Sequence, residues 1–229
     1  MVNSPKIAAL LPMRHNSERV VGKNYRRLGD APLFHHVVRT LLAAPSIDEI
    51  IIDTDSPTIK TQCAEHFPTV RIVDRPIDLT DGEIPMNRII QHDLDHTDAD
   101  VILQTHSTNP FLTTDTIEKT IETFSSEADV DSVFTVTRLQ QRLWKHDTIP
   151  VNHDPKVLLR TQDLEPLYIE NSCVFVFSRE LIVETGCRIG PNALMVEMDA
   201  MEAIDIDEES DFQLAQALWS ARNDEMTLA

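Results

Sequence analysis

The stretch that decides the fold is residues 7–24, which read IAALLPMRHNSERVVGKN. A short apolar run, residues 7–11, is followed directly by a polar loop that carries the cations Arg14, Arg19 and Lys23. An apolar run that ends at proline and polar residues is typical of a buried strand. Cations at the end of such a strand favour a bound anion, because arginine forks and lysine ammonium groups are common partners of phosphate. The alternative interpretation is a solvated basic turn.

The rest of the chain is acidic, which makes this loop unusual. The 229 residues contain 20 Lys and Arg against 38 Asp and Glu, a net charge of −18. Five of the 20 cations nevertheless fall within residues 14–27, beside the single acid Glu18. The acidic balance argues against nucleic acid or an anionic membrane surface as a partner, since both need a basic face. Three cysteines without CxxC spacing, and no apolar run of about 20 residues, predict a cytoplasmic protein without a membrane span.

Short apolar runs alternate with amphipathic stretches along the chain. The runs predicted to be strands are residues 7–11, 49–53, 70–73, 101–103, 132–136, 173–177 and 203–207. The stretches predicted to be helices are residues 33–42, 58–66, 86–94, 115–124 and 211–219. Continuous apolar runs suit strands that are covered on both faces. The pattern therefore predicts an α/β fold, a three-layer αβα sandwich on a mainly parallel sheet, with residues 1–229 as one domain.

Residues 138–170 break this alternation. They contain three prolines and little periodicity. A structureless loop of about 30 residues is rare inside a compact domain. We therefore predict an insertion that either folds against a partner subunit or covers the substrate.

Two further polar segments follow predicted strands. On an extended strand the carboxylates of Asp205 and Asp207 would point to one face, and such a pair suits Mg²⁺ together with phosphate oxygens. The alternative is a helix-capping acidic turn, because Glu208, Glu209 and Asp211 follow. Residues 104–110, QTHSTNP, supply hydrogen-bonding side chains for a polyhydroxylated ligand or a base edge, or form an ordinary loop.

Several common sites are absent from the sequence. The loop is neither a Walker A nor a GxGxxG motif, which argues against P-loop NTPases and dinucleotide oxidoreductases. No serine lies in a recognisable nucleophile elbow. His92 and His96 lie four residues apart, but the glutamate of an HExxH motif is missing, so we expect a solvated helix face.

Taken in order, these segments resemble the acylneuraminate cytidylyltransferases, also called CMP-sialic acid synthetases. The opening loop resembles the family's P-x-R-x-x-S-…-K-N motif through Pro12, Arg14, Ser17, Lys23 and Asn24. Further matching segments are residues 52–55 (IDTD), 74–79 (DRPIDL), 103–110 (LQTHSTNP), 171–172 (NS, where the family usually has Asn-Gly) and 203–207 (AIDID).

The resemblance implies a nucleotide-diphospho-sugar-transferase-like sheet with an inserted dimerisation segment, and a homodimer. It implies that the anomeric hydroxyl of a 2-keto sugar acid attacks the α-phosphate of CTP, which gives a CMP-sugar and pyrophosphate. Arg14, Lys23 and Asp207 would be catalytic. The nucleotide would contact Pro12, Arg14, Ser17, Lys23, Asn24 and Arg75. The sugar would contact Gln104, Thr105, Lys145, Tyr168 and Asn171. Mg²⁺ would bind to Asp205 and Asp207.

Two residues depart from the family pattern. Glu18 places an anion in the phosphate loop, and Ile169 occupies a position where many sialate enzymes carry an arginine. The sugar acid therefore stays open among sialate-like, legionaminate-like, pseudaminate-like and octulosonate compounds. Two other hypotheses remain: a metal-dependent glycosyltransferase that uses a nucleotide sugar, and a catalytically inactive nucleotide-binding homologue.

Overall fold

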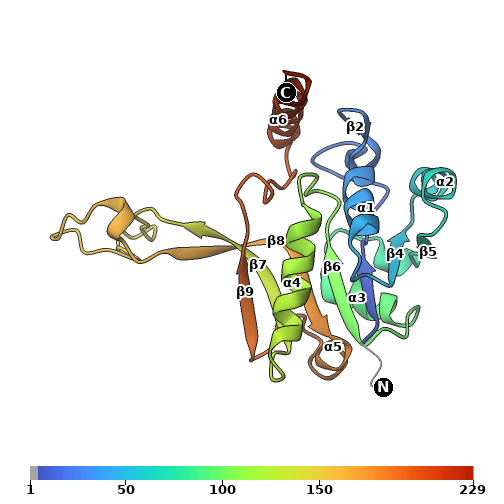
Figure 1. Cartoon of the computed structure of the whole chain (residues 1–229), viewed down its shortest axis with the longest axis horizontal. Coiled ribbons are helices and arrows are strands. Elements are labelled where there is room, and N and C mark those ends of the chain that lie inside the picture. The colour runs from blue at the N-terminus through green and yellow to red at the C-terminus, as the bar shows by residue number, and fades with distance from the viewer. Residues whose placement is uncertain (1–4, 229) are drawn as a thin grey trace.

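A central sheet of seven strands organises the chain (Figure 1). The structure is a computed structural model that describes residues 5–228, with side chains up to residue 222. The strand order is β5-β4-β1-β6-β8-β7-β9. Neighbouring strands are parallel except at β8, which is antiparallel to both β6 and β7. The strands are β1 (Ile7–Leu10), β4 (Glu49–Thr54), β5 (Arg71–Asp74), β6 (Val101–Thr105), β7 (Ser132–Leu139), β8 (Leu167–Ser178) and β9 (Ala193–Glu197).

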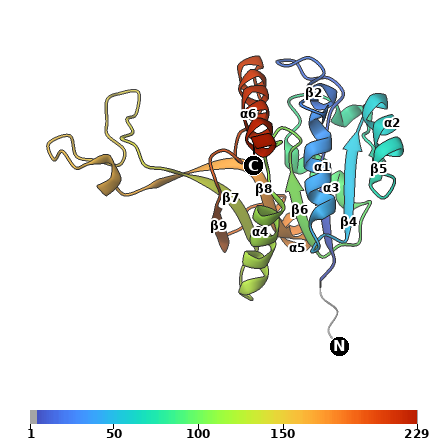
Figure 2. The same cartoon turned by 45° about the horizontal axis from the view of Figure 1, so that its top comes forward.

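Helices cover both faces of this sheet. One face packs against α1 (Leu33–Ala43), α2 (Pro57–His66) and α4 (Thr114–Ser126). The other packs against α3 (Met86–Leu94) and α5 (Arg179–Thr185). The last helix, α6 (Glu209–Leu228), packs on the hairpin of β2 (Arg27–Leu28) and β3 (Ala31–Pro32), as Figure 2 shows. The predicted three-layer αβα sandwich with a mainly parallel sheet is confirmed.

Strand β1 shows why the apolar runs are continuous. Ile7 and Ala9 face the cluster formed with α1, α2 and α4, whereas Ala8 and Leu10 face the cluster formed with α3 and α5. All four side chains are buried. A strand covered on both faces cannot alternate between apolar and polar residues.

The prediction that residues 203–207 form the last strand is wrong. In the described residues the one backbone–backbone hydrogen bond at Ile206 runs from the Ile206 N–H to the carbonyl of Thr108, at 2.9 Å, and the segment forms no ladder. Ile206 instead packs with Phe212 of α6. The Asp211 carboxylate accepts from the N–H groups of Asp207 (3.0 Å) and Glu208 (2.7 Å), so this acidic turn caps α6. The sheet instead contains β9. Neither β9 nor α5 was predicted from the sequence.

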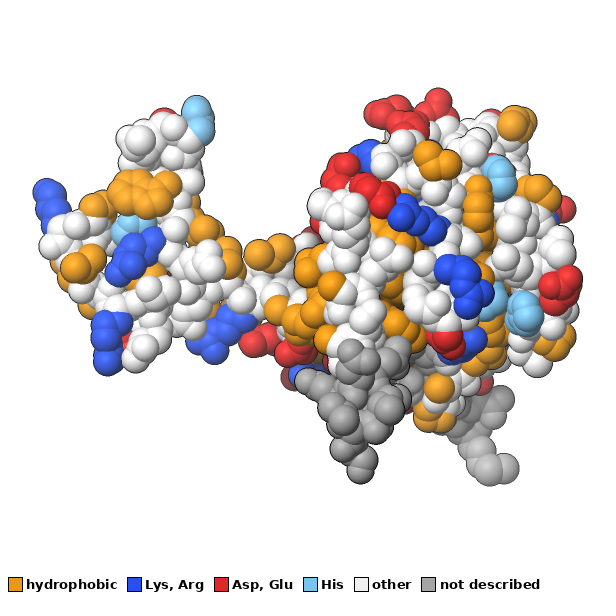
Figure 3. Space-filling model, turned by 90° about the horizontal axis from the view of Figure 1, so that it is seen from above, with side chains coloured by type: hydrophobic (Ala, Val, Ile, Leu, Met, Phe, Trp, Pro, Cys, Tyr) orange, Lys and Arg blue, Asp and Glu red, His pale blue; other side chains and the backbone are white. Residues whose placement is uncertain are grey.

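Residues 138–170 form an arm. Strands β7 and β8 continue beyond the sheet as a two-stranded stalk, with Leu139 opposite Leu167. Residues 140–166 lie at its end and include a short 3₁₀ helix, Thr161–Asp163. Figures 1 and 2 show the arm projecting away from the sheet. Its large exposed apolar side chains are Trp144, Ile149, Val151, Val157, Leu158 and Leu159, and Figure 3 shows hydrophobic side chains on the arm.

No helix in the described part of the chain combines the length and the apolar content that crossing a bilayer requires.

A bulge lies where the stalk leaves the sheet. The register between β7 and β8 shifts between Phe134 and Val136. Within the bulge Ser172 has φ 58°, in the left-handed region. The side chain of Asn171 fixes the bulge, because it accepts from Thr135 Oγ1 (2.8 Å) and from the N–H of Cys173 (3.2 Å). Residue 172 is the position where glycine was expected from the resemblance.

Ser172→Gly should stabilise the protein. A side chain in the left-handed region costs about 1–2 kcal/mol, and the entropy that glycine loses on folding offsets about 0.5–1 kcal/mol of this. We expect the free energy of unfolding, measured by urea denaturation, to rise by about 0.5–1 kcal/mol. Ser172→Ala is the control, since it removes the hydroxyl but keeps Cβ. An equal gain in both variants would contradict the explanation.

Candidate functional site

A cleft of about 360 Å³ lies at the carboxyl ends of the parallel strands. In such sheets ligands bind at this edge. One wall is the loop after β1, residues 12–24, here called the N-terminal loop; the facing walls are residues 81–84, the start of α3 and residues 106–108. All six residues that were expected to contact a nucleotide line the cleft: Pro12, Arg14, Ser17, Lys23, Asn24 and Arg75.

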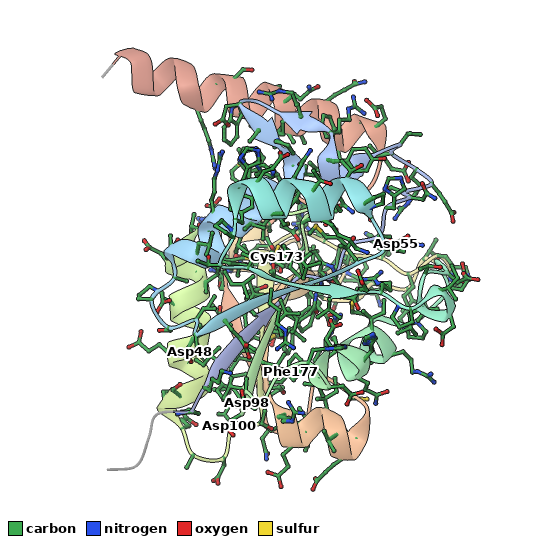
Figure 4. The ribbon with its side chains drawn as sticks, turned by 90° about the vertical axis from the view of Figure 1, so that its right-hand side faces the viewer. Asp48, Asp55, Asp98, Asp100, Cys173 and Phe177 are labelled. Atoms are coloured by element: carbon green, nitrogen blue, oxygen red, sulfur yellow. The ribbon has the colours of Figure 1, made fainter. Side chains whose placement is uncertain are left out.

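The end of β4 holds the start of the N-terminal loop in place. The N–H of Met13 donates to the carbonyl of Asp53 at 2.9 Å. The N–H of His15 donates to Asp55 at 2.7 Å, and the His15 ring bonds to Ser56 at 2.8 Å. Figure 4 shows Asp55 at this end of the sheet, with Asp48, Asp98 and Asp100 gathered at the opposite end.

Asn24 closes the N-terminal loop. Its buried side-chain amide donates to the carbonyl of Arg14 at 2.8 Å and accepts from the Ser107 hydroxyl at 2.7 Å. Before it, Gly22 has φ 66°, and a Cβ at this position would lie 2.7 Å from the ring of Tyr25. Only glycine fits this turn, which begins the 3₁₀ helix (Lys23–Tyr25) that presents Lys23.

The N-terminal loop meets the acidic segment before α6. The Lys23 ammonium lies 2.6 Å from the carbonyl oxygen of Ile206 and 3.4 Å from the carboxylate of Asp207. Arg19 contacts the same carboxylate at 2.9 Å. Burial raises the pKa of Asp205, and the nearby charge of Asp207 adds to this. The structure thus brings the expected cations and carboxylates together.

Arg14 differs from these cations because it forms no ion pair in the described part of the chain, although the carboxylate of Glu18 also reaches Gly82. Arg14 lines the cleft, and a Cβ at Gly82 would lie only 2.9 Å from Arg14 Nη1, so the guanidinium reaches the facing wall. None of the ion pairs formed in the described part of the chain includes Arg14. An uncommitted guanidinium in a cleft is suited to bind an anion.

Arg75, by contrast, is committed to a buried partner. Its Nε donates to the carboxylate of Asp53, and its Nη2 donates to the Asp53 carbonyl at 3.3 Å. Asp93 of α3 lies near Asp53, and burial together with this neighbouring carboxylate raises the pKa of Asp93 to about 9. Asp93 is therefore protonated at neutral pH. His92 is half-buried beside these carboxylates, not on the solvated helix face that we expected.

Asp93→Asn should remove a pH-dependent loss of stability. Between about pH 4 and pH 9 the unfolded state has lost the Asp93 proton while the folded state keeps it, so the free energy of unfolding falls as pH rises. Asparagine keeps a donor toward Asp53 without a proton to lose. We expect the melting temperature of the variant to exceed that of the parent at pH 8 by at least about 2–4 °C, equivalent to about 1 kcal/mol.

That difference should shrink as the pH approaches 4. Asp95→Asn, at the exposed end of the same helix, serves as the control and should behave like the parent. A difference for Asp93→Asn that stays constant between pH 4 and pH 8 would contradict the protonated state.

The residues expected to contact a sugar do not meet in this cleft. Thr105 is fully buried, and its hydroxyl donates to the carbonyl of Cys173 at 2.6 Å, so it belongs to the sheet. The Asn171 amide is occupied in the bulge. Lys145 and Tyr168 lie on the arm. Gln104 stays close, because its amide lies 3.1 Å from the ring of His106, which lines the cleft.

Two residues near Gln104 were not predicted individually, although His106 lies in the polar segment 104–110. The pKa of His106 is lowered to about 4, because the ring is desolvated and lies near the charges of Arg188 and Lys23. Arg188 Nη1 donates to Gln104 Oε1 at 2.5 Å. Arg188 is an isolated cation in the loop between α5 and β9, and no periodicity or motif could have indicated it.

Comparison with known proteins gives consistent matches. A family model described as "Cytidylyltransferase" matches residues 8–223. The chain is 26% identical over 220 residues to N-acylneuraminate cytidylyltransferase A of Danio rerio, which covers 93% of this chain and 50% of that protein. It is 25% identical over 225 residues to CMP-N,N'-diacetyllegionaminic acid synthase of Legionella pneumophila, and the match covers 93% of this chain and 96% of that protein. The chain thus spans about half the length of the first relative but nearly all of the second.

Solved structures support the fold. CMP:2-keto-3-deoxy-manno-octonic acid synthetase complexed with CTP matches with a TM-score of 0.71 and 12% identity, covering 95% of this chain and 99% of that one. 4-Diphosphocytidyl-2C-methyl-D-erythritol synthase from Anaerococcus prevotii matches with a TM-score of 0.71 and 16% identity, covering 94% and 96%.

Proposed function

The chain belongs to the cytidylyltransferase family, and on this premise we propose that it transfers CMP from CTP to a 2-keto sugar acid and releases pyrophosphate. The observation that carries the proposal is the cleft in which the uncommitted Arg14 lies with Lys23, which contacts Asp207. The names of the two relatives include N-acylneuraminate and N,N'-diacetyllegionaminic acid, which supports a sugar acid as the acceptor.

The N-terminal loop would hold the triphosphate. Arg14 offers a planar fork to phosphate oxygens, and Lys23 a compact charge from the other side of the loop. Ser17, half-buried in the same loop, offers a hydroxyl donor. Asn24 would act indirectly, because both ends of its amide already fix the loop. Arg75 would likewise shape the cleft while its charge stays paired with Asp53.

The reaction needs little covalent chemistry from the protein. The anomeric hydroxyl oxygen forms a bond to the α-phosphorus of CTP while the bond from that phosphorus to the β-phosphate oxygen breaks. Pyrophosphate leaves with the bonding electrons, and the hydroxyl proton passes to solvent. Arg14 and Lys23 would align the phosphates and stabilise the negative charge that develops on them.

Asp205 and Asp207 fit a magnesium ion by their chemistry. Both offer hard oxygen ligands, and the charge of Asp207 helps to raise the pKa of Asp205, a repulsion that a cation would relieve. When bound, the ion would neutralise phosphate oxygens of the nucleotide. The side chain of Asp207 also lies next to Lys23 and Arg19, so the acidic segment stays anchored to the N-terminal loop.

Arg14→Ala and Asp207→Ala should each reduce pyrophosphate release from CTP and a sugar acid by about 100-fold or more, the usual loss when one charge-stabilising group is removed. A pyrophosphate-release assay with a panel of nonulosonic and octulosonic acids measures this. Arg39→Ala, which removes an exposed arginine paired with Asp30, is the control and should keep full activity.

A parent protein that releases no pyrophosphate with any acid of the panel would contradict the proposed function. Tight CTP binding without turnover would then favour an inactive homologue. Release of a nucleoside diphosphate from a nucleotide sugar would favour a glycosyltransferase.

The arm would mediate a homodimer. Its apolar side chains are exposed in the single chain, and a partner subunit that covered them would remove them from water. Lys145 and Tyr168 would then reach a site only across the interface.

Since the cysteines form no disulfide in the described chain, the compartment that we propose is the reducing cytoplasm.

Leu158→Asp should weaken this dimer, because the leucine is 88% exposed on the arm and a carboxylate resists burial in an interface. Light scattering after size-exclusion chromatography should show a mass near 26.0 kDa for the variant and twice that for the parent. Val183→Asp is the control, since Val183 is 64% exposed on α5 away from the arm. A monomeric parent, or an equally dimeric Leu158 variant, would contradict the role of the arm.

A further inference from the structure

We propose that Arg188 binds the carboxylate of the sugar acid; this inference rests on the proposed function. A 2-keto sugar acid carries its carboxylate on the anomeric carbon, next to the hydroxyl that reacts. The site must therefore hold two anions close together, the triphosphate and this carboxylate. The N-terminal loop supplies the cations for the first, and a second cation is needed for the other.

Arg188 lies beside the cleft. It lines a second pocket, of about 380 Å³, together with Met86 and Glu170, and Met86 also lines the cleft that contains Arg14 and Lys23. The two hollows therefore adjoin at the start of α3. A ligand that extends from the triphosphate past Met86 would reach the guanidinium of Arg188.

Neighbouring side chains fix the orientation of Arg188. Its guanidinium stacks on the ring of Phe175, 3.7 Å from the ring centroid. Its Nη1 donates to Gln104 Oε1 at 2.5 Å. Arg188 is half-buried, and desolvation lowers the pKa of its guanidinium. A guanidinium held by a ring and an amide is ordered before the ligand arrives, which reduces the entropy cost of binding.

Arg188 forms no ion pair in the described part of the chain, although Glu170 lines the same pocket. No carboxylate there lies within 4.0 Å of it, and the acid that faces it, Glu170, acts only at longer range. Two other arginines with little exposure are accounted for. Arg75 pairs with Asp53, and Arg179 donates to the carbonyls of Leu94 and Thr97. Arg188 donates to one neutral amide, so most of its five N–H donors remain for a planar anion.

A line of contacts separates the two anion sites. Gln104 bonds to Arg188 through Oε1, and its Nε2 lies 3.1 Å from the ring of His106. The charges of Arg188 and Lys23 both act on that ring, which is neutral at pH 7. The order Lys23, His106, Gln104, Arg188 thus leads from the triphosphate cations to the second cation. The predicted sugar contact, Gln104, lies between them.

Steady-state kinetics of Arg188→Gln test the inference. Loss of a charged hydrogen-bond partner should raise KM for the sugar acid by about 10–100-fold. KM for CTP should change by less than about twofold, because the N-terminal loop is intact. Arg188→Lys should recover part of the loss, since it keeps the charge without the planar fork. Arg179→Gln is the matched control: it removes a half-buried guanidinium that donates to two carbonyls away from the cleft, and should leave both KM values unchanged.

The carboxamide of the same sugar acid identifies the group that Arg188 contacts. The parent enzyme should discriminate against the amide, and Arg188→Gln should lose this discrimination. The inference would be overturned by an unchanged KM for the sugar acid, by equal increases in both KM values, or by retained discrimination against the amide. In each of these cases pyrophosphate release by the parent would still uphold the proposed function. A parent that releases no pyrophosphate with any sugar acid would overturn both.

Discussion

The ammonium of Lys23 joins two segments that lie 183 positions apart in the chain. It lies 2.6 Å from the carbonyl oxygen of Ile206 and 3.4 Å from the carboxylate of Asp207. The first of these segments begins at the end of β1, and the second precedes α6. Because Ile206 is fully buried against Phe212, the acidic segment is held in place by packing, and Lys23 then ties the N-terminal loop to it. The two halves of the candidate site depend on this contact.

Charges around the cleft fall into two groups, and the difference defines what the site can do. Asp53 neutralises Arg75 inside the protein, where Arg75 lines the cleft. Arg14 and Arg188 have no carboxylate within ion-pairing distance in the part of the chain that the structure describes, and each faces a hollow. Charges that the fold does not use are available for ligands. Two such guanidinium groups, on either side of His106 and Gln104, fit an acceptor and a donor that are both anionic.

Sequence patterns predicted the sheet and the residues of the N-terminal loop that line the cleft, but they did not indicate Arg188. Continuous apolar runs such as Ile7–Leu10 identified the central strands, because a parallel sheet is buried on both faces. Residues 203–207 alternate like a strand, yet Ile206 is buried against α6, Ile204 is only partly buried, and Asp211 caps that helix. Thr105 ended an apolar run as a ligand contact would, but its hydroxyl bonds within the sheet. Arg188 had no pattern around it, since only the folded chain places it beside Gln104.

The central claim is that cations from the N-terminal loop and carboxylates from the segment before α6 surround one polyphosphate. A crystal structure of the protein with CTP and Mg²⁺ tests it most directly. The account predicts phosphate oxygens within hydrogen-bond distance of both Arg14 and Lys23, and a metal ion on Asp205 or Asp207. A triphosphate bound elsewhere, or one that reaches neither cation, would contradict the account.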